Sequence, residues 1–336
     1  MRSSFSLSAL MALASAAPYG PQTPLKNILE NTDKSDKYTY PTDFTRNILP
    51  KPFHSHNDYW RDVPFYSGLS QGAISTEADV WLLNGTLYVG HEPAALTDKR
   101  TLESLYIQPI LDTLHRQNPD TRFVQPGEQN GVFDTSSGQT LYFFIDIKTA
   151  VDETWPAVLA ALEPLRSGDW LTTYDGKTLR KKPVTVIGTG NTQLSDVVAS
   201  SPRDVFFDAP LAELNSVKYE SLSANESPIA STNFASSFGD VRKREFNDTQ
   251  LATLKSKLMR LMTRESWPGI GTSQLTRSEP GTQYGGSSGM GVLIYSTLMT
   301  WRLRLNFGRE LARWDDASWK TCDHIERHIR AQTKAV

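Results

Sequence analysis

Glu77 and Asp79 stand two residues apart within an apolar run of the sequence. Residues two apart in a β-strand point to the same face, so these two carboxylates are expected to lie side by side. Neighbouring buried carboxylates repel each other and lose their hydration, and a divalent cation offsets both costs. Asp146 ends a second apolar run and is the expected third ligand. Oxygen ligands favour Mg²⁺, with Ca²⁺ as the alternative.

The alternative interpretation gives these acids no metal. Glu77 and Asp79 would then lie on a solvated strand edge, and Asp146 would form a salt bridge with a basic neighbour. Two histidines weigh against it, because His54 and His91 also follow apolar runs. Histidine titrates near neutrality, so one ring can accept a proton while another donates one. Lys148 is expected to contact phosphate oxygens, and His56 to orient the metal ligands or contact substrate. This set of groups is what phosphodiester cleavage requires.

Short apolar runs that alternate with amphipathic segments must position these side chains. The pattern predicts strands at 52–54, 73–81, 140–148, 184–188, 205–209 and 229–233, and helices at 101–117, 153–165, 192–200 and 247–263. Such alternation is typical of βα units around a parallel sheet. We predict a TIM-type (β/α)8 barrel, in which the carboxyl ends of the strands meet at one mouth.

Turn signals and composition divide the chain further. Asn84-Gly85 predicts a type I′ hairpin, and a second hairpin is predicted at 174–177. We expect a signal peptide at 1–16, an extended segment at 17–47, the phosphodiesterase barrel at 48–264 and an atypical C-terminal region at 265–336. That last region is rich in Gly and Ser at its start, and no convincing pair of closing strands is predicted there.

The motifs that carry this chemistry resemble a known superfamily. The runs 54–59, 77–82 and 87–91, joined by 185–191 and 206–211, resemble the PLC-like phosphodiesterase superfamily. The resemblance is closest to fungal altered inheritance of mitochondria proteins and glycerophosphodiester phosphodiesterase-like proteins. Spider-venom phospholipase D toxins belong to the same superfamily. Membership implies a TIM barrel, Mg²⁺ and two catalytic histidines.

Position by position, the resemblance assigns roles to residues of this chain. His54 and His91 match the catalytic histidines, and the metal carboxylates are matched by Glu77, Asp79 and Asp146. The segment 146–149 is similar to an Asp-Leu-Lys-Thr segment of the toxins. Asn57 matches an asparagine near the first histidine, so it joins Lys148 and His56 as an expected substrate- or phosphate-binding residue.

The predicted function is therefore metal-dependent hydrolysis of a phosphoric diester on a glycerophospho- or lysophospholipid-type substrate. One alternative is an inactive barrel that acts as a binding protein. A zinc amidohydrolase is weaker, because no histidine lies between 116 and 323. His115 is expected as a surface or cap residue of a helix, and the pair His324 and His328 on a solvated helix face. A glycosidase is weaker still, since its two carboxylates are normally further apart.

Composition limits partners and location. The formal net charge of −2 gives no support for nucleic acid as a partner. The stretch 5–13 and the small residues 14–16 predict a cleaved signal and secretion, with a mitochondrial or other organellar location as the alternative. Sequons at Asn84 and Asn247 fit a glycoprotein. Cys322 is the only cysteine, which excludes an intrachain disulfide. At most transient contact with a membrane surface is expected.

Overall fold

The structure is a computed structural model that describes residues 38–233 except 126, 128 and 215, the strand 291–295, and a few isolated residues (28, 237, 248–250, 252, 253 and 256). Contacts divide the chain after Pro41, and the unit that begins at Thr42 contains the sheet and its helices. The predicted helix at 247–263 and the histidines at 324 and 328 lie largely or wholly outside the described residues, as do the predicted signal peptide and Asn247.

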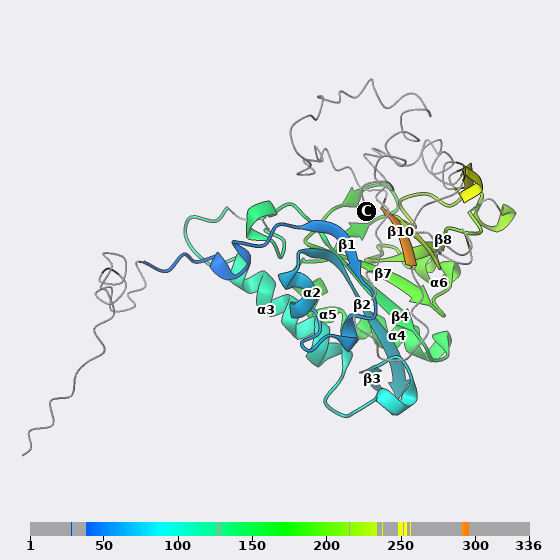
Figure 1. Cartoon of the computed structure of the whole chain (residues 1–336), viewed down its shortest axis with the longest axis horizontal. Helices are drawn as coiled ribbons and strands as arrows, with labels where there is room; N and C mark the ends of the chain where they lie inside the picture. The colour runs from blue at the N-terminus through cyan, green and yellow to red at the C-terminus, as the bar shows by residue number, and fades with distance from the viewer. Residues whose placement is uncertain are drawn as a thin grey trace, which may run out of the picture. The chain divides into compact units, whose positions relative to one another are not determined.

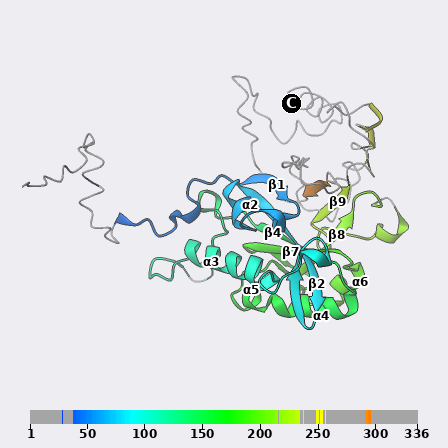
Figure 2. The same cartoon turned by 60° about the horizontal axis from the view of Figure 1, so that its bottom comes forward.

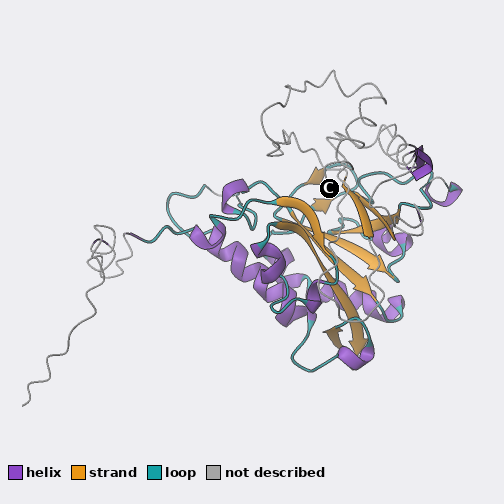
Figure 3. Cartoon of the chain, viewed as in Figure 1, coloured by secondary structure: helices purple, strands orange, loops and turns teal. Residues whose placement is uncertain are grey.

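A curled parallel sheet forms the centre of this unit (Figure 3). Its strands follow the order β1-β2-β4-β7-β8-β9, and each neighbouring pair is parallel. Their bounds are β1 (Lys51–Ser55), β2 (Ala73–Leu83), β4 (Leu141–Ile147), β7 (Val184–Gly190), β8 (Val205–Pro210) and β9 (Ile229–Asn233). All six predicted strands are confirmed. Their apolar runs are nearly continuous because strands of a parallel sheet are buried on both faces.

Two further strands join the edges of the sheet. The strand β3 (Thr86–Val89) pairs antiparallel with β2, and β10 (Gly291–Tyr295) pairs antiparallel with β9. The β2–β3 hairpin turns at Asn84 and Gly85, whose φ angles of 50° and 80° confirm the predicted type I′ turn. The second predicted hairpin is also confirmed, as β5 (Thr173–Tyr174) and β6 (Leu179–Arg180).

Helices α3, α5, α4 and α6 follow one another around one side of the sheet (Figures 1 and 2). Their bounds are α3 (Gln108–Gln117), α4 (Val151–Ala161), α5 (Glu163–Ser167) and α6 (Leu194–Ala199); the short α2 (Tyr66–Ser70) follows the β1 loop. Ile110 and Leu114 of α3 and Val158 of α4 are fully buried in the core. The predicted helix at 101–117 begins as a π-helix (Glu103–Ile107), which sequence periodicity did not indicate.

The parallel sheet confirms the predicted α/β class. Of the predicted barrel, it confirms a half-barrel of six parallel strands. Within the described residues, β1 pairs with β2 alone and β10 with β9 alone, so closure is not seen. The antiparallel β10 differs from the parallel strands of a (β/α)8 barrel, and it is a strand that we did not predict after residue 264. Its apolar run 292–295 was the available signal. None of the helices described is long and apolar enough to cross a membrane.

Candidate active site

The pairing of β2 with β4 brings three carboxylates together. Asp79 stands opposite Asp146 in the parallel register, and Glu77 precedes Asp79 by two residues on the same face. One carboxylate oxygen from each residue lies within 4.8 Å of the other two. The structure therefore gathers the three metal ligands predicted from the sequence, at the carboxyl ends of neighbouring strands.

The donor set fits a hard divalent cation. Asp79 Oδ1 and Asp146 Oδ1 are buried and have no hydrogen-bond partner among the described residues. Buried carboxylate oxygens without a partner are costly, and oxygen atoms are the ligands that Mg²⁺ and Ca²⁺ take. Gly190, at the end of β7, leaves the space: a β-carbon there would overlap Asp146 Oδ1.

Lys148 supplies the one ammonium group found beside the cluster in the described part of the chain. Its Nζ lies 2.7 Å from Asp146 Oδ2 and 3.0 Å from Asp79 Oδ2. The side chain keeps 26% of its surface exposed. Burial opposes the charged form of Lys148, yet the two aspartates raise the pKa of the amine above its usual value. Lys148 is therefore a fixed positive charge at the rim of the cluster.

Burial and mutual repulsion set the charges of the acids. Desolvation raises the pKa of Asp146 to about 7, the negative charge of Asp79 adds to this effect, and Lys148 opposes it. Burial and the charge of Glu77 likewise raise the pKa of Asp79. Glu77 behaves in the opposite way. Although burial opposes its ionisation, the hydrogen bond and charge of His54, with help from neighbouring groups, lower its pKa to about 2.

His54 lies at the end of β1 with its ring held on three sides. Its Nδ1 lies 2.7 Å from the hydroxyl of Ser75, and its Nε2 lies 3.5 Å from Glu77 Oε2. The ring packs edge-on against Phe144 at 4.8 Å between centroids. Only 7% of the side chain is exposed. Ser75 and Glu77 of β2 and Phe144 of β4 thus hold His54 beside the carboxylates.

The loop after β1 turns back over the same cluster. Asn57 adopts a left-handed conformation with φ of 48°, and its backbone N–H donates to Glu77 Oε2 at 2.8 Å. The hydroxyl of Tyr59 lies 2.7 Å from Asn57 Oδ1 and 2.8 Å from Asp79 Oδ2. It also lies 3.0 Å from Nδ1 of His91. The loop therefore links both histidine-bearing segments to the carboxylates.

A buried acid anchors this loop. Asp58 has no exposed surface and accepts hydrogen bonds from Ser55 Oγ (2.6 Å), Phe65 N (2.5 Å) and Tyr106 Oη (3.2 Å). Tyr106 Oη also donates to the carbonyl of Glu77 at 2.9 Å. The π-helix that carries Tyr106 thereby connects the loop to β2. Burial raises the pKa of Asp58, and its position indicates a structural role.

His91 and His56 occupy the more open part of the site. The side chain of His91 is 53% exposed, and its ring lies 5.2 Å from that of Trp60. Among the described residues, Nε2 of His91 has no hydrogen-bond partner, so it can exchange a proton with a bound group. His56 Nε2 lies 3.8 Å from Glu77 Oε2. Burial lowers the pKa of His56, which favours its neutral ring.

All eight residues predicted for the site lie at this end of the sheet. Their catalytic, metal-binding and substrate-binding roles stay predictions. Asn57, a predicted substrate- or phosphate-binding residue, contacts Glu77 through its backbone N–H and Tyr59 through its Oδ1. His115 lies exposed on α3, as predicted, with its ring 6.1 Å from Trp170.

No role was predicted from the sequence for Tyr59, Ser75, Gly190 or Asp208. Tyr59 belongs to the run 54–59, Gly190 to the run 185–191, and Asp208, on β8, to the run 206–211, and these runs are the only signal for the three residues. Ser75 could have been found by extending the two-residue period of Glu77 and Asp79 backwards along the strand.

Comparison with known proteins assigns the chain to a family. A family model described as an AIM6-like phosphodiesterase domain matches residues 42–208. The altered inheritance of mitochondria protein 6 homolog of Arthroderma benhamiae is 49% identical over 269 residues, which cover 77% of this chain and 84% of that protein. No solved structure matches.

Two yeast proteins are more distant relatives. The altered inheritance of mitochondria protein 6 of Eremothecium gossypii is 38% identical, and that of Saccharomyces cerevisiae (strain S288c) is 40% identical. The matched regions cover 53% of this chain in both cases, and 47% and 49% of the two yeast proteins. The chain thus spans about half the length of these two relatives.

Proposed function

Because the chain belongs to the AIM6-like phosphodiesterase family, we propose that it is a metal-dependent phosphoric diester hydrolase acting on glycerophospho- or lysophospholipid-type substrates. The observation that carries this proposal is the cluster of Glu77, Asp79 and Asp146, with two orphaned carboxylate oxygens, between His54 and His91. A phosphodiesterase needs positive charge for the phosphate and groups that move protons, and both lie here.

The three carboxylates would hold the cation. When bound, Mg²⁺ would supply positive charge that stabilises the phosphate oxygens as negative charge develops on them. Lys148 Nζ, within 3.0 Å of two of these ligands, would bind a further phosphate oxygen as a fixed charge. The partly exposed side chain of Lys148 is consistent with this second contact.

The two histidines would divide the proton transfers. His91 is open to solvent at Nε2 and is oriented through Nδ1 by the Tyr59 hydroxyl, which suits a ring that gives or takes a proton at a bound diester. His54 is nearly buried, and its Nε2 faces Glu77. His54 would therefore give or take its proton beside the Glu77 carboxylate. Asn57 and His56 would lie on the same side of the site as His54, where each would either position a neighbouring group or contact the substrate.

The half-barrel supports a wider structural proposal. Six parallel strands with intervening helices form a half-barrel, and we propose that they belong to a (β/α)8 barrel. The family model ends at residue 208, within β8.

An inactive barrel with a binding role is the second candidate, because the same residues could hold a ligand without turnover. A zinc amidohydrolase has less support, since the cluster consists of carboxylates and no histidine comes from β4, β7, β8 or β9. The exposed ring of His91, which can exchange protons with a bound group, favours catalysis over simple binding.

Secretion is proposed from the N-terminal segment alone. Asn84 lies exposed in the β2–β3 turn, which is accessible to glycosylation in a secreted chain. The names of the relatives refer to inheritance of mitochondria, and they favour the organellar alternative. Immunolocalisation of the full chain, with and without residues 1–16, separates these two locations.

Hydrolysis of a phosphodiester panel tests the enzymatic proposal. The panel contains bis(p-nitrophenyl) phosphate, glycerophosphodiesters and lysophospholipids, each assayed in Mg²⁺ and in EDTA. We expect EDTA-sensitive hydrolysis that His54→Ala abolishes and that His115→Ala, a histidine exposed on α3, leaves intact. Folded protein that hydrolyses no diester but binds one with Mg²⁺ indicates the inactive alternative. Recovery of the chelated protein by Zn²⁺ alone would overturn the metal assignment.

A further inference from the structure

The hydroxyl of Tyr59 lies between polar atoms from three segments of the chain. Asn57 Oδ1 is 2.7 Å from the hydroxyl oxygen, Asp79 Oδ2 is 2.8 Å from it, and His91 Nδ1 is 3.0 Å from it. A phenol has an ordinary pKa of about 10, so this hydroxyl keeps its one proton at neutral pH. Three neighbours therefore surround a single proton.

Two of these neighbours can only accept a hydrogen bond. The amide oxygen of Asn57 and the carboxylate oxygen of Asp79 have lone pairs and no proton of their own. The Tyr59 hydroxyl donates to these oxygens, at 2.7 Å and 2.8 Å. Whichever of the two oxygens holds the proton, none is left for the nitrogen of His91.

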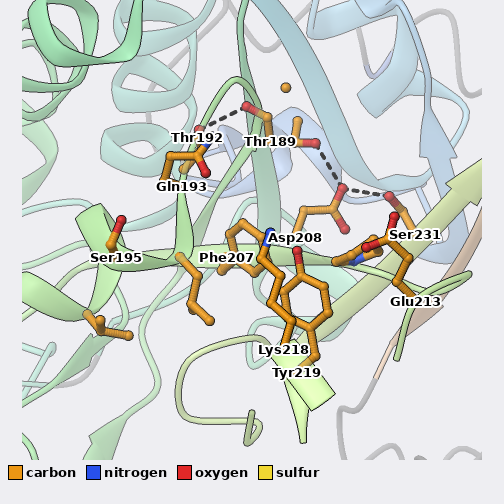
Figure 4. Close-up of a pocket in the computed structure, with 14 residues that line it drawn as sticks. Thr189, Thr192, Gln193, Ser195, Phe207, Asp208, Glu213, Lys218, Tyr219 and Ser231 are labelled. Carbon is orange, nitrogen blue, oxygen red and sulfur yellow. Dashed lines mark hydrogen bonds between the residues drawn. The ribbon is translucent and has the colours of Figure 1, made fainter. Parts of the chain in front are cut away.

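The hydroxyl groups around Asp208, on β8, follow the same rule. Asp208 Oδ2 accepts hydrogen bonds from Thr189 Oγ1 at 2.9 Å and from Ser231 Oγ at 2.5 Å (Figure 4). A hydroxyl has one proton and two lone pairs, so each of these groups offers only lone pairs to a further neighbour. Tyr59 is in the same situation, and its further neighbour is His91.

The proton between Tyr59 and His91 must therefore belong to the imidazole ring. A neutral imidazole carries one N–H and one lone pair. When Nδ1–H donates to a lone pair of the Tyr59 oxygen, the lone pair of the ring lies at Nε2. Asp79 Oδ2, 3.5 Å from the same Nδ1, favours the same arrangement. Nε2 then lies on the open part of a side chain that is 53% exposed.

Tyr59 is held firmly in this position. The residue is only 2% exposed, and its carbonyl accepts a hydrogen bond from Arg100 Nη2 at 2.5 Å. Its ring packs edge-on against Trp60, with 5.9 Å between centroids, and Trp60 also lies 5.2 Å from the ring of His91. The hydroxyl therefore stays between its two acceptors and the imidazole.

We propose that Tyr59 fixes the neutral ring of His91 in the tautomer that carries its proton on Nδ1, and thereby makes Nε2 the atom at which His91 gains and loses a proton. The effect on catalysis rests on the proposed function, whereas the tautomer is a property of the protein without substrate. Tyr59 is a positioning residue in this proposal, because it acts through His91.

Nitrogen-15 NMR of the histidine rings tests the tautomer without turnover. Spectra are recorded in EDTA at about pH 9, well above the ordinary pKa of histidine, and His91→Gln identifies the signals of His91. We expect a protonated Nδ1 and an unprotonated Nε2 in the wild-type chain. Tyr59→Phe should populate the tautomer with its proton on Nε2. A wild-type ring protonated at Nε2, or an unchanged tautomer in Tyr59→Phe, overturns the proposal.

Tyr219→Phe is the matched control for this experiment. Tyr219 is also buried, and it lines the cavity between the ends of β7 and β8 (Figure 4). The substitution removes the same hydroxyl group from a tyrosine that has no printed contact with His91, so the tautomer of His91 should stay as in the wild-type chain. A change of tautomer in this control as large as that in Tyr59→Phe would contradict the role of Tyr59.

Kinetics test the positioning role. At saturating Mg²⁺, Tyr59→Phe should lower kcat for the best diester of the panel roughly 10-fold or more with little change in KM, because proton transfer is impaired and substrate binding is not. Adding Tyr59→Phe to His91→Gln should cost no further activity, since Tyr59 acts through His91. A further loss in the double variant refutes the positioning role and indicates a structural one.

The outcomes separate this proposal from the proposed function. A folded chain that hydrolyses no diester refutes the proposed function, while the NMR spectra still decide the tautomer. If the chain hydrolyses a diester but His91 carries its proton on Nε2, the function stands and the proposal for Tyr59 fails. If Tyr59→Phe does not fold, the tautomer of the wild-type chain decides.

Discussion

Gly190 lies against the carboxylate of Asp146, and no larger residue fits between them. A β-carbon at residue 190 would overlap Asp146 Oδ1 and approach the carbonyl of Ile147 to 2.7 Å. Gly190 also has a φ angle of 66°, in the left-handed region that side chains disfavour. The end of β7 is thus shaped around a ligand of the candidate cation site.

Gly190→Ala is expected to weaken cation binding. The new methyl group must displace the carboxylate of Asp146 from its present position, so we expect at least a roughly 10-fold loss of Mg²⁺ affinity, measured by calorimetry. Gly176→Ala is the matched control, because Gly176 also has a positive φ, of 92°, but its nearest neighbour would be 3.9 Å from the new carbon. It should cost about 1–2 kcal/mol of stability without changing Mg²⁺ affinity. Equal Mg²⁺ affinities in both variants would contradict the role of Gly190.

Lys148→Met should change cation and substrate binding in opposite directions. Removing the ammonium group leaves the carboxylates with less competing positive charge, so Mg²⁺ should bind more tightly. The phosphate loses a charged contact, so KM for a diester should rise roughly 10-fold. Lys182→Met is the control, because Lys182 pairs with Asp169 away from the site, 2.5 Å from its Oδ2. Weaker Mg²⁺ binding in Lys148→Met would show that the lysine organises the carboxylates instead.

The pH dependence of stability should differ with and without the cation. Burial raises the pKa of Asp146 to about 7 and that of Asp208 to about 6, so the folded chelated protein binds protons that the unfolded chain has released. Its free energy of unfolding should therefore rise as pH falls from 7 to about 5. Below about pH 4.5 the protonation of Glu77, whose pKa is lowered to about 2, should reverse this trend.

Thermal melting between pH 4 and 8, in EDTA or in Mg²⁺, measures this dependence. Mg²⁺ needs ionised carboxylates, so the rise in Tm that it causes should be largest above about pH 7 and should vanish near pH 5. Asp146→Asn should flatten the profile in EDTA. A Tm in EDTA that rises steadily from pH 5 to 8 would be inconsistent with protonated, buried Asp146.

Much of the carboxylate cluster could be predicted from the sequence because it depends on local periodicity. Glu77 and Asp79 share a face through the two-residue period of a strand, and apolar runs that end in ionisable residues located β1, β2 and β4. The contacts of Tyr59, Gly190 and Asp208 could not be predicted in this way. They depend on the 3₁₀ turn Asp58–Trp60, which returns the Tyr59 side chain to the sheet, and on the register of strands far apart in the chain.

Hydrolysis as a function of Mg²⁺ concentration tests the central claim most directly. The chelated protein is titrated with Mg²⁺ while hydrolysis of bis(p-nitrophenyl) phosphate is followed, alongside Asp79→Asn and Asp146→Asn checked for folding by thermal melting. We predict no activity without the cation, saturable activity with it, and a large loss of Mg²⁺ affinity in both variants. Full activity of the wild-type chain in EDTA, or unchanged Mg²⁺ dependence in both variants, would contradict a carboxylate-held cation at this site.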